Sequence, residues 1–290
     1  MNTPRRHHFV PKILLKRFTD QDGWLHFFNK DDPEPTVRRA RPTNLFVQNH
    51  YYSEIASDGS RDTRIEHWLG KLENDAEPIL SKIISSVERN KLPNLTANER
   101  FTWVRFFVTQ WRRVPDLHDQ TRNDFAAKEF DAVIGRVKNR FPNRETEIEA
   151  LQTTEQKARI IRNAYARMLQ NAPSEPERVV NERGIVFLSI DADKAFIIGS
   201  RPVIQMNFTQ GQTLADHSSE MWLPISSKIA VGVGYQWERE KLLYLRDGRA
   251  IRHLNTAIAE NSSSFASSCK KLTASIARSL VQSLEPISRP

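Results

Sequence analysis

Cysteine is almost absent from this sequence, since Cys269 is the only one among 290 residues. A single cysteine excludes an intrachain disulfide and any zinc cluster built from several cysteines. Cys269 stands in the stretch SSSFASSCKK, where we expect a helix and a small packed side chain. A catalytic thiolate needs a supporting histidine or a helix N-terminus, and the sequence shows neither near it. Cysteine catalysis is therefore not expected.

Long apolar runs are also lacking. No segment reaches the length needed to span a membrane, and the N-terminus has no long apolar stretch typical of a secretory signal. The composition is 39% hydrophobic and 27% charged, which is typical of a globular protein rather than a disordered one. We therefore expect a cytoplasmic protein without a membrane partner.

Basic residues outnumber acidic ones, with 43 Lys and Arg against 35 Asp and Glu, giving a formal net charge of +8. An excess of this size attracts polyanions. The basic residues are most noticeable in an N-terminal arm, from Arg5 to Arg17, and between Arg100 and Arg144. Nucleic acid is therefore an expected partner, and a protein partner is the alternative.

The first sixty residues read as short strands and turns. GWLHFFNKDD predicts a strand followed by a turn, and NHYYSEI predicts another strand that ends at SDGS. A helix is then predicted from Asp62 to Asn90, because apolar residues recur at helical spacing. Pro78 lies within this range and argues against an unbroken helix.

The next predicted helix begins at LTANER and ends near Pro115. Thr96 followed by Glu99 matches a capping box, in which each side chain bonds the backbone of the other residue. Its apolar residues cover nearly the whole circumference, so the helix is expected in the core. Two amphipathic helices are predicted at 116–139 and 146–170, and NAPSEPER at 171–178 reads as a linker.

Beyond the linker the pattern changes to strands. The strand candidates are GIVFLSI, KAFIIGS, VIQMNF, EMWLPIS and IAVGVGY, and residues 252–283 read as helix again. The order predicts an α+β fold: a strand-rich N-terminal part, central helices, C-terminal antiparallel strands packed on the helices and a C-terminal helix. We expect one composite domain over 1–290. Its alternative subdivision is a helical part at 1–170 and a strand-rich part at 179–290.

Four motifs occur in order along most of the chain: HHFVPKILLKRF, FVTQWRRVP, FIIGSRPV and WLPIS. Together they resemble a bacterial family of unknown function, domain-of-unknown-function family 4238. The pattern of that family is HHxxPxxxLxxF, QxxRxP, FxxSDxPV and PLS. Where the family has Ser-Asp, this chain has Gly199 and Ser200, so an activity that depends on that aspartate would be altered. The resemblance also implies a role linked to phage defence or toxin-like effectors.

The adjacent histidines of the first motif are the leading candidates for catalysis. Neighbouring side chains of an extended chain point to opposite faces, so only one of His7 and His8 can face a given site. Pro11 then predicts the start of a helix. A histidine presented on such a strand-turn-helix resembles small metal-dependent nucleases, in which it activates water. The alternative is that the pair caps or packs an N-terminal helix.

Carboxylates along the helix predicted at 62–90 are candidate metal ligands. Glu66 and Glu73 lie seven residues apart, on one stripe beside the apolar face, and carboxylates suit Mg²⁺ or Mn²⁺. A solvated helix face is the alternative explanation. His50 is a further candidate for that site, whereas His26 and His67 are expected to be structural.

Gln110 and Arg113 lie three apart at the end of the helix that follows, on the face that also carries Trp103. A partly buried arginine needs an anionic or carbonyl partner. We weigh an internal ion pair against a clamp for a substrate phosphate, which the planar guanidinium suits. Arg112 lies on another face and is a candidate for substrate binding.

The strand-turn FIIGSRPV places Ser200 and Arg201 at a strand end, where binding sites are common, so both are candidates for substrate binding. VGVGY matches no nucleotide fingerprint. Taken together, the residues predict a nuclease-like, metal-assisted phosphodiesterase with a site built on His7 or His8, Gln110 and Arg113, and with Mg²⁺ or Mn²⁺ on Glu66 or Glu73. A non-catalytic module that binds nucleic acid or protein is the runner-up.

Overall fold

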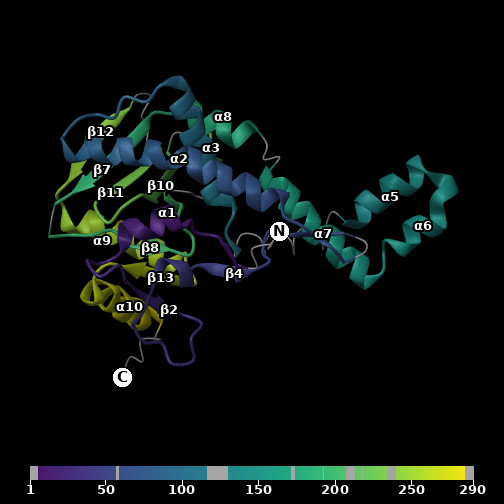
Figure 1. The fold of residues 1–290 in the computed structure, drawn as a ribbon, viewed down its shortest axis with the longest axis horizontal. Coiled ribbons are helices and arrows are strands. Elements are labelled where there is room, and N and C mark those ends of the chain that lie inside the picture. Colours follow the sequence, from purple (N-terminus) through teal and green to yellow (C-terminus); the bar gives the residue numbers. More distant parts are fainter. Residues whose placement is uncertain are drawn as a thin grey trace. The chain divides into compact units, whose positions relative to one another are not determined.

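The structure, a computed structural model, describes residues 6–56, 59–115, 130–170, 174–191, 193–206, 213–216, 218–233 and 240–284 (Figure 1). Its α+β class confirms the class predicted from the sequence. The chain forms two compact units that interleave along the sequence. Unit 1 comprises Met1–His7, Gln48–Lys71 and Arg112–Ala172, and unit 2 comprises His8–Val47, Leu72–Trp111 and Pro173–Pro290.

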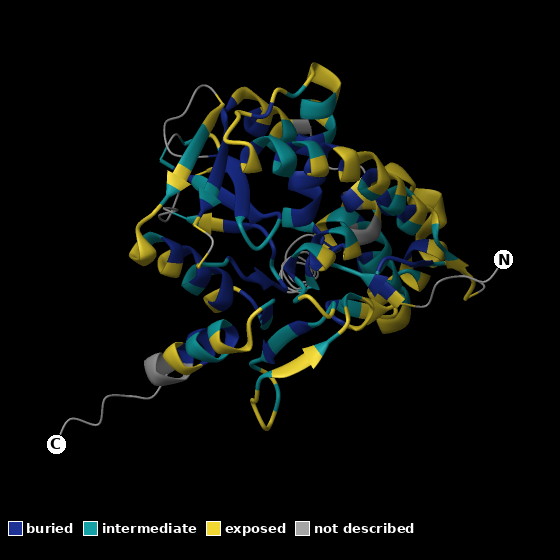
Figure 2. Ribbon diagram, turned by 60° about the vertical axis from the view of Figure 1, so that its left-hand side comes forward, coloured by how far each residue is buried: buried dark blue, intermediate teal, exposed yellow. Residues whose placement is uncertain are grey.

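A five-stranded sheet forms the centre of unit 2. Its strands in spatial order are β12 (Lys241–Leu245), β7 (Ile185–Ile190), β11 (Ile229–Val233), β10 (Glu220–Pro224) and β9 (Ile204–Met206). The pairs among β7, β11, β10 and β9 are antiparallel, as expected, but β12 pairs with β7 in parallel. This exception arises because β12 follows β11 in sequence yet lies beyond β7. Figure 2 shows the inner strands in the colour of buried residues.

Strand packing explains why the VGVGY stretch has a glycine at position 232. It lies in β11, opposite Trp222 of β10, and all five residues of β11 are buried. A Cβ atom at Gly232 would lie 1.9 Å from the backbone oxygen of Met221. Any side chain here therefore collides with the neighbouring strand, so the glycine serves strand packing.

A second sheet of unit 2 joins the two ends of the chain. Its strands in spatial order are β3 (Arg38–Ala40), β2 (Leu25–Asn29), β13 (Ser264–Ser267) and β8 (Ile198–Gly199). The prediction of continuous helix over 252–283 is wrong at β13, which separates α9 (Gly248–Glu260) from α10 (Lys270–Leu284). Serine is a modest helix former, and β13 supplies the backbone partners of both β2 and β8.

Helices α9 and α10 cover these sheets. α9 contacts β8 and β13 of the four-stranded sheet and β9 and β12 of the five-stranded one, while α10 contacts β2 and β13. Cys269 lies immediately before α10, and its exposed thiol contradicts the expected packed position. The thiol therefore contributes little to the core.

The two long helices predicted in the middle of the chain are confirmed. α2 (Arg64–Glu88) runs unbroken through Pro78, and α3 (Ala97–Arg112) follows it. The backbone N–H of Thr96 donates to Glu99 Oε2 at 2.7 Å, and the N–H of Glu99 donates to Thr96 Oγ1 at 3.2 Å. The capping box therefore forms as predicted, and it satisfies two N–H groups that a helix start leaves open.

Unit 2 also holds several short elements. These are α1 (Lys12–Leu15), the 3₁₀ turns Lys16–Phe18 and Pro42–Asn44, and α8 (Ser174–Glu182). α8 covers most of NAPSEPER, so the expected linker is helical from Ser174 onward. Two further strands, β1 (Arg6–His8) and β4 (Val47–Asn49), pair with each other, and each includes residues of both units.

In the part of unit 1 that the structure describes, a short hairpin and further helices accompany the beginning of α2. The hairpin pairs β5 (Glu54–Ile55) with β6 (Arg61–Asp62), and the helices are α5 (Phe130–Arg140), α6 (Glu145–Ala150) and α7 (Thr154–Gln170). Phe130, Ile134, Ile148 and Ile161 form the apolar core of the helices. Residues 116–129 of the helix predicted at 116–139 lie outside the described residues.

A fragment of residues 1–170 is expected to lack cooperative unfolding. Such a fragment keeps β2 but removes β13, which pairs with β2 along four residues, and it removes the whole five-stranded sheet. Two strands alone are at best marginally stable. Urea denaturation followed by circular dichroism would test this. A single sharp transition of normal stability for the fragment would contradict it.

Candidate functional site

The two histidines of the opening motif have different environments. His7 is fully buried, with 0% of its surface exposed, whereas His8 is partly buried and its Nε2 lies 3.1 Å from the carbonyl oxygen of Pro42. Opposite orientations of this kind are expected for neighbours in the strand β1. His7 is therefore the histidine around which a buried site can be built.

His7 lies within a cluster of unit 1 that gathers segments far apart in sequence. Its Nδ1 is 3.0 Å from Oε2 of Glu66, which lies in the first turn of α2. The same Nδ1 is 3.1 Å from the backbone nitrogen of Tyr52, and the two rings stack with centroids 5.9 Å apart. The ring of His50 stands edge-on at 6.3 Å. The sequence candidates His7 and Glu66 are thus direct neighbours.

The two contacts at Nδ1 correspond to different proton positions. Nδ1 accepts from the Tyr52 N–H only when it carries no proton, and the neutral ring then holds its proton on Nε2. When Nδ1 is protonated instead, the neutral ring presents a lone pair on Nε2, and the proton on Nδ1 lies near the Glu66 carboxylate, whose Oε2 is 3.0 Å from Nδ1. The second arrangement is the one used by histidine bases whose orientation is fixed by a carboxylate.

Arg113 joins this cluster through Tyr52. It follows the last residue of α3 and only 1% of it is exposed. Its guanidinium carbon lies 5.7 Å from the centroid of the Tyr52 ring, and the Tyr52 hydroxyl donates to the Arg113 carbonyl oxygen at 2.8 Å. Tyr52 therefore connects His7 to Arg113. Sequence analysis missed this role, because two adjacent tyrosines in NHYYSEI suggested only a strand.

His50 occupies a turn that the sequence could not specify. Its φ of 54° is in the left-handed region, which is uncommon for residues other than glycine. Its carbonyl oxygen accepts from Nη2 of Arg162 at 2.7 Å. Arg162 is therefore a second residue near the cluster that the motifs did not indicate, because it lies 112 positions further along the chain.

Gln110 lies in the last turn of α3 and is fully buried. Within the described residues, neither its amide nitrogen nor its amide oxygen has a hydrogen-bond partner. A buried polar group left unsatisfied destabilises a protein by about 1–3 kcal/mol, and such groups call for an explanation such as a bound water, ion or substrate. Arg112 ends the same helix and is partly exposed. The predicted roles of both residues in the site stay predictions.

The turn that departs from the family pattern packs within unit 2. The Ser200 hydroxyl accepts from the backbone nitrogen of Ser263 at 3.0 Å, and the backbone nitrogen of Arg201 donates to Ser262 Oγ at 3.2 Å. A Cβ at Gly199 would lie 2.1 Å from that same Ser262 oxygen. These contacts give Gly199 and Ser200 a structural function in holding the turn, while substrate binding by Ser200 and Arg201 stays a prediction.

The part of the chain that is described contains no preformed set of side chains that could enclose a metal ion. No group of three or more His, Cys, Asp or Glu side chains there is arranged to hold an ion. Glu66 is instead next to His7, and Glu73 lies further along α2 and is partly buried.

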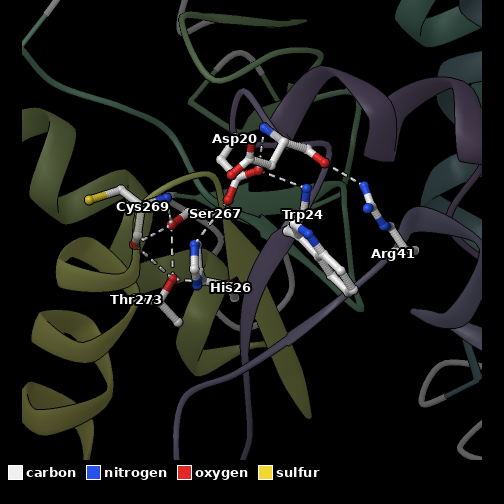
Figure 3. Close-up of polar contacts among 8 residues, drawn as sticks. Asp20, Trp24, His26, Arg41, Ser267, Cys269 and Thr273 are labelled. Atoms are coloured by element: carbon white, nitrogen blue, oxygen red, sulfur yellow. Dashed lines mark hydrogen bonds and ion pairs between the residues drawn. The ribbon is translucent and has the colours of Figure 1, made fainter.

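A second carboxylate–histidine pair lies in unit 2, between Asp20 and His26 (Figure 3). His26 Nε2 is 3.3 Å from Asp20 Oδ2. Partial burial acts to raise the pKa of Asp20, but the backbone N–H groups of Trp24 and Asp22, with His26, outweigh it and lower that pKa. The Cys269 sulfur points away from His26, so no cysteine–histidine pair forms. The pair holds the turn before β2, in line with the structural role expected for His26.

Comparison with known proteins gives one match. The family described as "Protein of unknown function (DUF4238)" matches residues 6–271, and the chain therefore belongs to this family, as the four motifs predicted. No curated protein and no solved structure shows significant similarity to the chain. Within the described residues, no helix combines the length and the apolar character needed to cross a membrane.

Proposed function

We propose that the protein is a phosphodiesterase that hydrolyses nucleic acid, with His7 as its general base. The observation that carries this proposal is the 3.0 Å separation of His7 Nδ1 and Glu66 Oε2. A carboxylate beside one ring nitrogen fixes the ring and stabilises the imidazolium that forms when the other nitrogen takes a proton. The formal net charge of +8 supports a polyanionic substrate.

The proposed step is attack of water on phosphorus. Nε2 of His7 takes a proton from the water, the new P–O bond forms, and the bond to the leaving oxygen breaks. The Arg113 guanidinium neutralises charge that develops on the phosphoryl oxygens.

The burial of His7 sets a condition on this proposal. With none of its surface exposed, Nε2 can meet a substrate only when the cluster opens during binding. Closure around substrate is common among enzymes, and it excludes competing water. The proposed enzyme therefore alternates between the closed cluster seen here and an open one.

A divalent cation remains part of the proposal. Mg²⁺ is usually held by one or two carboxylates together with substrate phosphates, rather than by a complete protein cage. Glu66 and Glu73 are the candidates for those carboxylates. When bound, the ion would polarise the phosphoryl group.

We expect the purified chain to cleave a fluorescent oligonucleotide in the presence of Mg²⁺ or Mn²⁺ and to lose this activity in excess chelator. DNA and RNA, single-stranded and duplex, would be compared by gel electrophoresis over several hours. Absence of cleavage for all four substrates with either ion would contradict the proposal.

The complete burial of His7 also favours a second candidate, a module that binds nucleic acid or protein without catalysis. In that case the His7–Glu66 pair would only stabilise the fold. Such a module is expected to show salt-sensitive affinity for nucleic acid, with no product under any of the conditions above.

A further inference from the structure

The end of α5 and the turn that joins it to α6, residues 136–144 and here together called the α5–α6 turn, have an unusual composition. The nine residues 136–144, RVKNRFPNR, contain four basic side chains and no acidic one. An aromatic ring, Phe141, stands among them. Basic and aromatic side chains together are typical of surfaces that bind single-stranded nucleic acid.

Phe141 is left outside the core that holds its own helices. That core consists of Phe130, Ile134, Ile148 and Ile161, with further apolar residues packed around it. The Phe141 side chain is not among them, and 47% of the residue is exposed. Most phenylalanines are buried because of the apolar surface they carry, so an exposed one beside arginines needs an explanation.

The backbone fixes the position of this ring. The N–H of Phe141 donates to the Val137 carbonyl oxygen at 2.9 Å, and the N–H of Arg144 donates to the Phe141 carbonyl oxygen at 3.1 Å. Pro142 begins the 3₁₀ turn that follows and restricts the conformation of the residue before it. The backbone that carries the ring is therefore ordered, which reduces the entropy lost when a ligand binds.

A hollow of about 330 Å³ lies beside the ring. Its lining residues are Lys138, Asn139, Phe141, Pro142, Glu145 and Ile148. The hollow thus combines an aromatic face and apolar side chains with amide and charged groups. A flat heterocycle that carries hydrogen-bonding edges suits such a lining.

The cations of the turn are only weakly paired. Lys138 lies 3.8 Å from Glu149 and Arg144 lies 3.7 Å from Glu147, and exposed pairs at these distances contribute little. Arg140 has its guanidinium carbon 5.8 Å from the centre of the Phe141 ring. Arg136 is exposed to solvent. The positive charge of the turn is therefore accessible to phosphates.

We propose that the α5–α6 turn binds single-stranded nucleic acid, with a base stacked on Phe141 and phosphates at Arg136, Arg140 and Arg144. A base offers its face to an aromatic ring only when it is free of a duplex stack, which is why the ring selects single strands. The inference rests on the proposed nucleic-acid substrate, but the turn binds with or without hydrolysis.

The test measures fluorescence anisotropy of a labelled 20-nucleotide single strand, as DNA and as RNA, with the matching duplexes alongside. Phe141→Ala is expected to weaken single-strand binding about 5- to 150-fold, the range of one stacked base, and Phe141→Tyr is expected to retain it. Phe101→Ala is the matched control, because Phe101 is 57% exposed on α3 and lies outside the turn.

Two results would overturn the inference: wild-type protein that does not bind the single strands, or Phe141→Ala with unchanged affinity. Cleavage assays on the same samples separate this inference from the proposed function. If Phe141→Ala loses binding and no sample cleaves the oligonucleotide, binding by the α5–α6 turn is supported and only the proposed phosphodiesterase activity is contradicted. If Phe141→Ala cleaves the oligonucleotide and binds it with unaltered affinity, only the proposed binding by the α5–α6 turn is contradicted. The DNA and RNA arms identify the preferred sugar.

Discussion

Replacing His7 with alanine is expected to lower the rate of oligonucleotide hydrolysis by about 10²–10⁴-fold, the usual contribution of a positioned general base. The reason is that the buried ring next to Glu66 is the only group in the proposal that accepts the proton from water. Rates would be measured under single-turnover conditions, so that slow product release does not hide the chemical step.

His8→Ala is the matched control for this prediction. The two histidines are adjacent in β1, but His8 contacts the Pro42 carbonyl oxygen and has no part in the proposed chemistry. We expect it to retain hydrolysis within a few-fold of wild type. Thermal melts of both variants would separate loss of chemistry from loss of folding. Equal inactivation of two folded variants would contradict the assignment to His7.

Gly232→Ala is expected to have the largest effect on stability, lowering the free energy of unfolding by about 3 kcal/mol or more, at the upper end for overpacking. The added methyl group would meet the Met221 backbone oxygen at 1.9 Å. β11 is held on both sides, by β7 and β10, so neither strand can move aside without losing hydrogen bonds. Urea denaturation would measure the change.

Gly135→Ala serves as the control, with the opposite sign. Gly135 lies within α5, and a Cβ there would meet no atom within 4 Å. Alanine in a helix interior is more stable than glycine by roughly 0.5–1 kcal/mol. A small stabilisation is therefore expected. Equal effects of the two substitutions would show that the contact at Met221 does not matter.

Local signals in the sequence were sufficient to predict the helices α2 and α3. The capping box at Thr96 and Glu99 predicted the start of α3, because the contacts are made within four residues. Pro78 argued against an unbroken helix, but α2 continues through it. β13 was missed because its strand character depends on pairing with β2, more than 230 positions away in the chain, and nothing within SSSFASS reveals that partner.

The candidate site was partly predictable, because only some of its residues carry a signal in the local sequence. His7, Glu66 and Arg113 were selected by residue type and by helical spacing, and the structure places His7 and Glu66 in contact. Tyr52, which lies between His7 and Arg113, carries no recognisable motif. The lack of a hydrogen-bond partner for the Gln110 amide among the described residues is likewise a property of packing, which the sequence does not show.

The most direct test of the central claim is a double-mutant cycle between His7 and Glu66, read out as the single-turnover rate of oligonucleotide hydrolysis. Glu66→Gln keeps the shape of the side chain while removing its charge. If Glu66 acts through His7 and not as a metal ligand, the variant carrying both His7→Ala and Glu66→Gln will be no slower than His7→Ala alone. Losses that multiply in the double variant would contradict the claim that the two residues act as one pair.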